Sequence, residues 1–136
     1  ISAMSKIVSQ TTSNPSAVAQ YAAIEALTGD QTDIENMRAE FEQRLNTIYP
    51  LVNEIPGFET IKPQGAFYLF PKVAKAMAIK GFTDVTAFCD DILEETAVAV
   101  LTGAGFGADD NLRMSYATDM ATLVDAVNRL KAYMTA

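Results

Sequence analysis

Histidine is absent from the 136 residues of this sequence, and cysteine occurs once, as Cys89. The lack of histidine excludes Ser-His and Cys-His nucleophilic catalysis and removes the commonest zinc ligand. A single cysteine forms no internal disulfide, which fits the reducing cytoplasm. Any chemistry must therefore come from arginine, lysine, tyrosine, carboxylates, a cofactor or a partner chain.

Long hydrophobic runs and clusters of basic residues are also absent. No apolar run is long enough to span a bilayer, so the sequence predicts no transmembrane helix. Seventeen Asp and Glu outnumber ten Lys and Arg, which gives a formal net charge of -7. This excess of negative charge disfavours binding to nucleic acid or to an anionic membrane. Asp109-Asp110 lacks the ligand spacing of a calcium loop, so no metal site is predicted.

The N-terminal residues carry no targeting signal. Ile1 is not an initiator residue, and residues 1–10 show the features of neither a signal peptide nor a transit peptide. We therefore expect the chain to be a piece of a longer protein that extends upstream of Ile1.

Capping residues and apolar periodicity predict several helices, and β-rich runs between them predict strands. A polar loop over residues 9–15 precedes the first expected helix, which is capped by Ser13 or Asn14. The expected helices run from Pro15 or Ser16 to Gly29, from Thr32 or Asp33 to Pro56-Gly57 with a kink near Pro50, from Asp84, and from Thr118 or Asp119. The expected strands are Phe58–Ile61, Gly65–Phe70, Ala97–Leu101 and Asn111–Ala117. This order predicts an α+β fold, a small antiparallel or mixed sheet covered by helices.

Arg113 is the most informative residue. Side chains alternate across a strand, so Leu112, Met114 and Tyr116 share one face, and Arg113 and Ser115 share the other. A guanidinium presents a flat fork that matches a carboxylate with two parallel hydrogen bonds. The functional interpretation is a carboxylate clamp at the edge of a cleft. The alternative is an ordinary ion pair or a solvated face.

Two glycine-containing segments have structural as well as functional interpretations. Gly103–Gly107 matches neither phosphate-binding motif and leads into a strand, so a flexible turn is favoured. Gly65 allows close approach of backbone to a ligand, or a bend at the entrance of a strand. The neighbouring aromatic residues Phe67, Tyr68 and Phe70 are expected in the core and at its rim.

Four segments, in order, resemble the class I aminotransferases, and bacterial aspartate aminotransferases most of all. These segments are Ser9–Pro15 followed by Ala19-Gln20, Pro63–Tyr68, Val98–Gly103 with Phe106-Gly107, and Leu112–Ala117. The resemblance implies pyridoxal 5'-phosphate (PLP) as cofactor and the fold type I architecture. Residues 32–136 would form the C-terminal small domain. Residues 1–31 would be the junction segment and linker helix from the large domain.

The resemblance also implies roles for individual residues. Arg113 would bind the substrate α-carboxylate, and Asn14, Gly65 and Ser115 would line the site. The intact protein would be a cytoplasmic homodimer that transfers an amino group between an amino acid, expected to be aspartate, and a 2-oxo acid.

No catalytic or cofactor-binding residue is expected in this chain, because the family's Schiff-base lysine lies in the missing N-terminal cofactor-binding domain. Ser5-Lys6-Ile7-Val8 lacks the aromatic residue that follows that lysine in the family. The isolated chain is therefore predicted to be inactive. The alternatives are another fold type I enzyme (a carbon–sulfur lyase or an aromatic aminotransferase), a non-enzymatic acidic interaction domain, and a small-anion binding domain.

Overall fold

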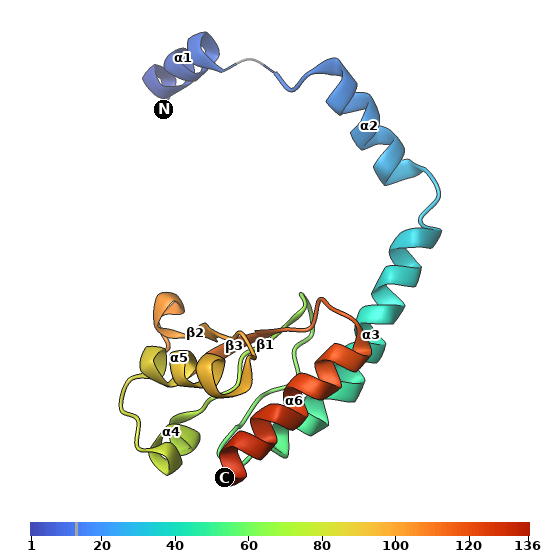
Figure 1. The fold of residues 1–136 in the computed structure, drawn as a ribbon. Coiled ribbons are helices and arrows are strands. Elements are labelled where there is room, and N and C mark those ends of the chain that lie inside the picture. The colour runs from blue at the N-terminus through green and yellow to red at the C-terminus, as the bar shows by residue number, and fades with distance from the viewer. Residues whose placement is uncertain (13) are drawn as a thin grey trace. The chain divides into compact units, whose positions relative to one another are not determined.

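A computed structural model describes residues 1–12 and 14–136 and divides them into two compact units, Ile1–Met37 and Arg38–Ala136 (Figure 1). Its elements are α1 (Ser2–Thr11), α2 (Ala17–Thr28), α3 (Thr32–Asn53), β1 (Tyr68–Leu69), α4 (Ala74–Lys80), α5 (Val85–Thr96), β2 (Leu101–Thr102), the 3-10 helix η1 (Ala104–Phe106), β3 (Leu112–Ser115) and α6 (Met120–Thr135). The predicted α+β class is confirmed. The assignment of residues 1–31 and 32–136 to two domains of the intact protein stays a prediction.

The first unit contains α1, α2 and the start of α3. The predicted loop over residues 9–15 is shorter than expected, because α1 continues to Thr11. The Ser16 hydroxyl caps α2 by accepting a hydrogen bond from the Ala19 amide at 3.3 Å, so Asn14 is not the cap. The other predicted cap, Ser13, lies outside the described residues. Gly29 ends α2 as predicted.

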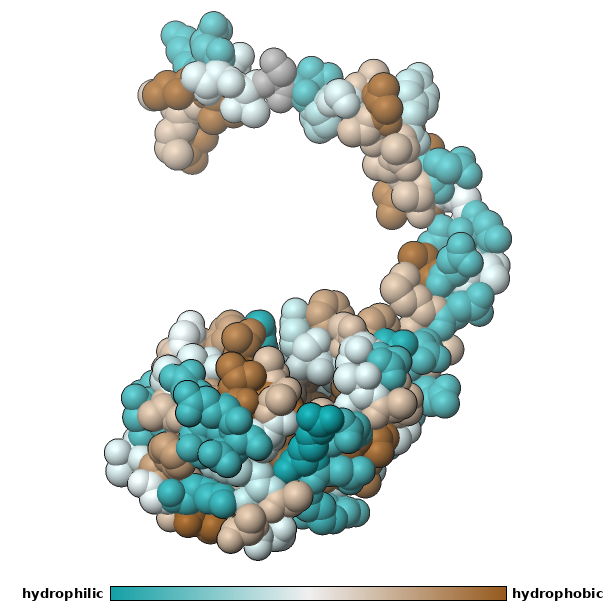
Figure 2. Space-filling view, in the orientation of Figure 1, coloured by the Kyte–Doolittle hydropathy of each residue, from teal (hydrophilic) through white to brown (hydrophobic). Residues whose placement is uncertain are grey.

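Neither α1 nor α2 has a buried residue. Figure 2 shows hydrophobic side chains on the surface of both helices. The exposed large apolar residues of these helices are Met4, Ile7, Val8, Val18, Tyr21, Ile24 and Leu27.

Helix α3 begins at Thr32 as predicted and contributes only its later part to the second unit. Ile48 and Val52 are buried in the core of that unit, and Phe41 and Leu45 pack against it. Pro50 lies in the last turn of α3, where three residues of helix follow it, and the helix ends at Asn53.

The sheet has three antiparallel strands in the order β1-β3-β2. Tyr68 pairs with Ser115, and Leu101 pairs with Arg113. One face of the sheet is buried against the helices. The buried side chains from the sheet and from α3, α5 and α6 form one hydrophobic cluster that includes Leu69, Leu112, Met114, Phe88, Ile92, Val127 and Leu130.

Three predicted strands are shorter in the structure or absent from it. Phe58–Ile61 contributes only an isolated bridge between Glu59 and Lys72. The Gly65–Phe70 strand is reduced to Tyr68–Leu69, because Ala66 has a left-handed conformation with φ of 57°. In Ala97–Leu101 only Leu101 is paired, since Ala97 ends α5 with φ of 54°. Local turns at the two alanines thus interrupt runs of strand-forming residues.

Carboxylate caps fix the starts of the two longer helices of the C-terminal half. Asp84 accepts from the Thr86 amide at 2.8 Å and begins α5. Asp119 accepts from the Thr122 amide at 2.9 Å and begins α6. Both helix starts match the predictions. Within the part of the chain that is described, no helix is long and apolar enough to cross a membrane.

Candidate functional site

Strand β3 separates the core from the candidate site. Leu112 and Met114 are buried, with exposed fractions of 0% and 8%, whereas Arg113 is half-buried and Ser115 is exposed. This alternation confirms that Arg113 and Ser115 project from the face of the sheet opposite the core. The helices cover the other face, so the Arg113 face remains open to other groups.

The guanidinium of Arg113 lies among aromatic rings. Its Cζ atom lies 4.5 Å from the centroid of the Tyr68 ring and 4.8 Å from that of the Phe106 ring. Tyr68 belongs to β1, and Phe106 ends η1. Both distances lie within the range of a cation–π contact.

Arg113 differs from the other arginines because it has no acidic partner among the residues that the structure describes. Arg38, Arg44 and Arg129 each form an ion pair with a carboxylate four residues away on the same helix. Among residues 1–12 and 14–136, no carboxylate lies within ion-pair distance of Arg113. An unpaired, half-buried guanidinium is a ready site for a carboxylate from outside the chain.

The other predicted site residues occupy different places. Ser115 lies two residues beyond Arg113, and its hydroxyl accepts a hydrogen bond from the Ala117 amide at 3.2 Å. Gly65 lies in the turn before β1, and a Cβ atom built there would meet no atom within 4 Å. This chain therefore imposes no steric need for glycine at that position. Asn14 lies between α1 and α2 in the first unit, whereas Arg113, Ser115 and Gly65 belong to the second.

Tyr116 forms two hydrogen bonds to the turn that contains Gly65. The sequence predicted Tyr116 on the core face of the strand and gave it no further role. The Tyr116 hydroxyl donates to the Ala66 carbonyl, and its amide donates to the Phe67 carbonyl, both at 2.9 Å. Burial raises the pKa of the Tyr116 hydroxyl, which keeps it protonated as a donor. This pair of bonds fixes the approach of the chain to β1 and therefore the position of Tyr68.

Two contributors to the site were missed from the sequence. Tyr68 was expected in the core or at its rim, and the Gly103–Gly107 loop was expected to be a flexible turn. The structure instead turns residues Ala104–Phe106 into a 3-10 helix and brings the Phe106 ring onto Arg113. The only sequence signal was an aromatic residue between glycines.

A separate cavity of about 310 Å³ lies beside the sheet, between residues 97–100 and α6. Ser115 and Met114 contribute to its wall, but Arg113 does not. The cavity therefore does not contain the candidate carboxylate-binding group. Within the described residues, no group of three or more Cys, Asp or Glu side chains is arranged to hold a metal ion.

The family model for class I and II aminotransferases matches residues 1–130 of this chain. The chain belongs to this family.

Individual relatives agree with the family match. The chain is 65% identical over 134 residues to the asparagine–oxo-acid transaminase of Streptococcus mutans, with 98% of this chain and 34% of the relative covered. It is 52% identical over 136 residues to the aspartate aminotransferase of Geobacillus stearothermophilus, with 100% of this chain and 35% of the relative covered. The chain thus spans about a third of the length of these relatives.

Solved structures show the same similarity in three dimensions. The aspartate aminotransferase from Rhizobium meliloti superposes with a TM-score of 0.83 at 34% identity, over 98% of this chain and 35% of that chain. The aromatic aminotransferase from Pyrococcus horikoshii gives a TM-score of 0.80 at 31% identity, over 96% and 34%. The expected resemblance to fold type I aminotransferases is therefore confirmed.

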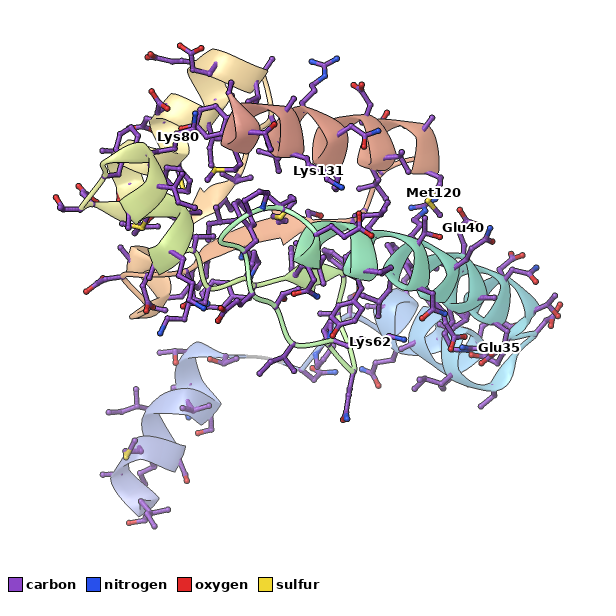
Figure 3. The ribbon with its side chains drawn as sticks, turned by 90° about the horizontal axis from the view of Figure 1, so that it is seen from below. Glu35, Glu40, Lys62, Lys80, Met120 and Lys131 are labelled. Atoms are coloured by element: carbon purple, nitrogen blue, oxygen red, sulfur yellow. The ribbon has the colours of Figure 1, made fainter. Side chains whose placement is uncertain are left out.

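Class I aminotransferases use PLP, bound through a lysine whose amine must be neutral to react. Three lysines of the second unit form ion pairs with carboxylates, which favour the charged amine. Lys72 pairs with Asp110 at 2.9 Å, and the hydrogen bond and charge of that carboxylate raise the lysine pKa, which is the wrong direction. Lys75 pairs with Glu59, and Lys131 with Glu54. Figure 3 shows Lys62 in the connection between α3 and β1, Lys80 on α4 and Lys131 on α6. The three paired lysines therefore do not fit the lysine that binds PLP.

Proposed function

We propose that the full-length protein is a PLP-dependent aminotransferase and that this chain supplies Arg113 to bind the substrate α-carboxylate. PLP would be the electron sink for the reaction, and its lysine would come from an N-terminal cofactor-binding domain outside this chain. The supporting observation is the half-buried Arg113 guanidinium, which faces away from the core and has no carboxylate partner among the described residues. The 136 residues alone are proposed to be inactive.

The proposed amino donor is aspartate or asparagine, and the acceptor is a 2-oxo acid. Two of the relatives are named for these two amino acids. An aromatic aminotransferase remains the second candidate, because a solved structure of that name superposes on nearly the whole chain. Both candidates need a cation for the α-carboxylate, so the role of Arg113 is common to them. Nothing in the comparisons reported above favours the carbon–sulfur lyase or the non-enzymatic alternatives.

Further parts of the proposal concern the surroundings of the site. Asn14, Gly65 and Ser115 are proposed to line the site in the assembled enzyme. The enzyme is proposed to be a homodimer in the cytoplasm, where a single cysteine stays reduced. The loop that contains Asn14 would then lie near the neighbouring subunit's active site.

Arg113→Met in the full-length protein tests the proposal. A charged hydrogen-bonded pair contributes about 1.5–3 kcal/mol, so kcat/KM for the amino donor is expected to fall by roughly 10- to 150-fold. Arg113→Lys keeps the charge but loses the planar fork and should give an intermediate loss. Steady-state kinetics with aspartate, asparagine and aromatic amino acids as donors would measure the change and also separate the two candidates.

Arg129→Met is the matched control, because Arg129 forms its ion pair with Asp125 on the surface of α6. This variant is expected to keep the kinetics of the unsubstituted protein. Unchanged kinetics in Arg113→Met would reject the proposed role of Arg113.

A further inference from the structure

The aromatic contacts of Arg113 come from two independently supported rings. Tyr68 is held by strand pairing, because it lies opposite Ser115 in the β1–β3 register. In an antiparallel pair, opposite residues share a face, so Tyr68 lies on the same face of the sheet as Arg113. The Tyr68 ring is half-buried, and the Phe67 ring packs on it at 4.6 Å between centroids. Tyr68 is therefore a fixed wall of the site.

Phe106 is held by the backbone of its loop. The Gly103 carbonyl accepts from the Phe106 amide at 2.8 Å and from the Ala108 amide at 3.1 Å. The Gly103 amide donates to the Asn111 carbonyl at 2.8 Å, which ties the loop to the start of β3. A Cβ atom at Gly103 would lie 2.3 Å from that same carbonyl oxygen, so only glycine permits this close return.

The Phe106 side chain lies outside the hydrophobic core of this unit. The residue is 57% exposed, and its ring packs edge-on against Phe70, with the centroids 6.1 Å apart. The ring also forms the cation–π contact with the Arg113 guanidinium. A loop closed by backbone hydrogen bonds thus presents an exposed side chain to Arg113, the one arginine among the described residues that lacks an ion pair. Burial in the core of this unit does not explain the position of this ring.

We propose that Phe106, together with Tyr68, is a positioning residue that holds the guanidinium plane of Arg113 ready for the substrate carboxylate. This inference rests on the proposed function and adds a determinant of substrate affinity to it. An arginine with no partner samples many rotamers, and ordering it on binding lowers affinity. Contacts between the rings and the faces of the guanidinium restrict that sampling in advance. They leave the in-plane N–H groups available for a bidentate pair.

The π face of Phe106, rather than its bulk, is the property that the test must isolate. Phe106→Leu keeps an apolar side chain of similar reach but removes the ring. Phe106→Tyr keeps the ring and should preserve the cation–π contact. Because residue 106 is exposed, neither substitution is expected to disturb the core, and thermal unfolding would verify this.

The experiment uses the full-length protein and measures two quantities. The first is the affinity for the dicarboxylate succinate by calorimetry, which needs no turnover. The second is the pair KM and kcat for the amino donor. Phe106→Leu is expected to weaken succinate binding and raise KM about fivefold, the scale of one immobilised side chain, with a smaller change in kcat. Phe106→Tyr is expected to recover most of the lost affinity.

Equal behaviour of the two variants would overturn the inference, whether both matched the unsubstituted protein or both were impaired. A fall in kcat without a change in affinity would also overturn it. Failure of the proposed function would be seen separately, as unchanged kinetics in Arg113→Met. Loss of activity in Arg113→Met together with no effect in Phe106→Leu would reject the positioning role alone.

Discussion

Residues 1–37 and residues 38–136 form equally regular helices but differ in what stabilises them. Helices α1 and α2 bury no side chain, and their large apolar residues are exposed. Helices α5 and α6 bury one face each, in a core shared with the sheet and with α3. Isolated helices of ten to twelve residues are marginal in water, since most helix stability in proteins comes from packing. We therefore expect the free energy of unfolding of this chain to reside in the second unit.

This difference shows what helix signals in a sequence do and do not report. Caps such as Ser16 and Asp119 mark helix starts equally well in both units. They act through hydrogen bonds within a few residues and carry no information about a packing partner. A sequence therefore predicts where a helix lies more readily than what it packs against.

Matched leucine substitutions should give the largest contrast between the units. Leu130 on α6 is fully buried, whereas Leu27 on α2 is 79% exposed. Leu130→Ala is expected to lower the free energy of unfolding by about 2–5 kcal/mol, because it removes buried apolar contacts and leaves a cavity. Leu27→Ala should change it by no more than about 0.5 kcal/mol. Urea unfolding of the 136-residue chain, followed by circular dichroism, measures both.

The substitutions Leu130→Ala and Leu27→Ala should also be compared in the full-length protein. If the exposed face of α2 packs against residues outside this chain, Leu27→Ala will become destabilising there. Equal effects of the two substitutions in the 136-residue chain would contradict the assignment of its stability to the second unit.

Thiol reactivity should give the next largest contrast. Burial raises the pKa of Cys89 from 9.0 to about 11, with smaller contributions from the charges of Asp90 and Asp84. At pH 8 the thiolate fraction of Cys89 in the folded chain would then be roughly a hundredfold lower than that of a cysteine with the ordinary pKa. The thiolate is the reactive form. Ala22→Cys places a second thiol on exposed α2. Labelling with iodoacetamide, followed by mass spectrometry, should show fast modification at position 22 and slow modification at Cys89.

The raised pKa of Cys89 also makes the free energy of unfolding fall at alkaline pH. Its folded pKa is raised, so the unfolded chain loses the thiol proton first as pH rises. The contribution is fully present below the ordinary cysteine pKa and is lost as pH rises toward about 11.

In the labelling experiment, modification of Cys89 at the same rate as position 22 would show that α5 is not stably packed.

The outcome for the strands explains which parts of the fold could be predicted. The four predicted helices were placed correctly to within a few residues, because their caps and periodicity are local signals, whereas α1 was not predicted. The strand at Leu112–Ser115 was also found, since its apolar residues alternate. Gly65–Phe70 and Ala97–Leu101 were predicted too long, because left-handed turns at Ala66 and Ala97 override β propensity. The length of a strand depends on its pairing with other strands, and this pairing is difficult to predict from a single sequence.

The candidate site, like the strands, was predicted from the sequence only in part. The orientation of Arg113 followed from alternation along one strand and is confirmed by the burial of Leu112 and Met114. The α-carboxylate role came only from resemblance to a family, because the residue pattern alone favoured an ordinary ion pair or a solvated face. The contact with Phe106 was not predictable, since it depends on the return of the loop at Gly103 to Asn111.

Two aspartates offer the smallest and most closely matched contrast. Asp30 in the first unit accepts hydrogen bonds from the Thr32 hydroxyl at 2.6 Å and the Thr32 amide at 3.0 Å. Asp119 in the second accepts from the Thr122 hydroxyl at 2.6 Å and amide at 2.9 Å. In both cases the threonine hydroxyl is the largest cause of a lowered carboxyl pKa. The local chemistry is the same, but Asp119 begins a helix that has buried residues from Leu123 onward, whereas Asp30 precedes the part of α3 that lies in the first unit.

The lowered pKa of Asp119 predicts the direction of its pH effect. The unfolded carboxylate takes up its proton at higher pH than the folded one, so the stabilisation is present above the ordinary aspartate pKa. It is lost as pH falls through the lowered folded value. Asn caps a helix without titrating, so Asp119→Asn should make the stability of the chain less sensitive to acid. Asp30→Asn should leave that sensitivity unchanged, because α2 and the start of α3 add little to the global stability. Urea midpoints at neutral pH and at about pH 3 would measure both, and an equal response of the two variants would show that the first unit unfolds together with the second.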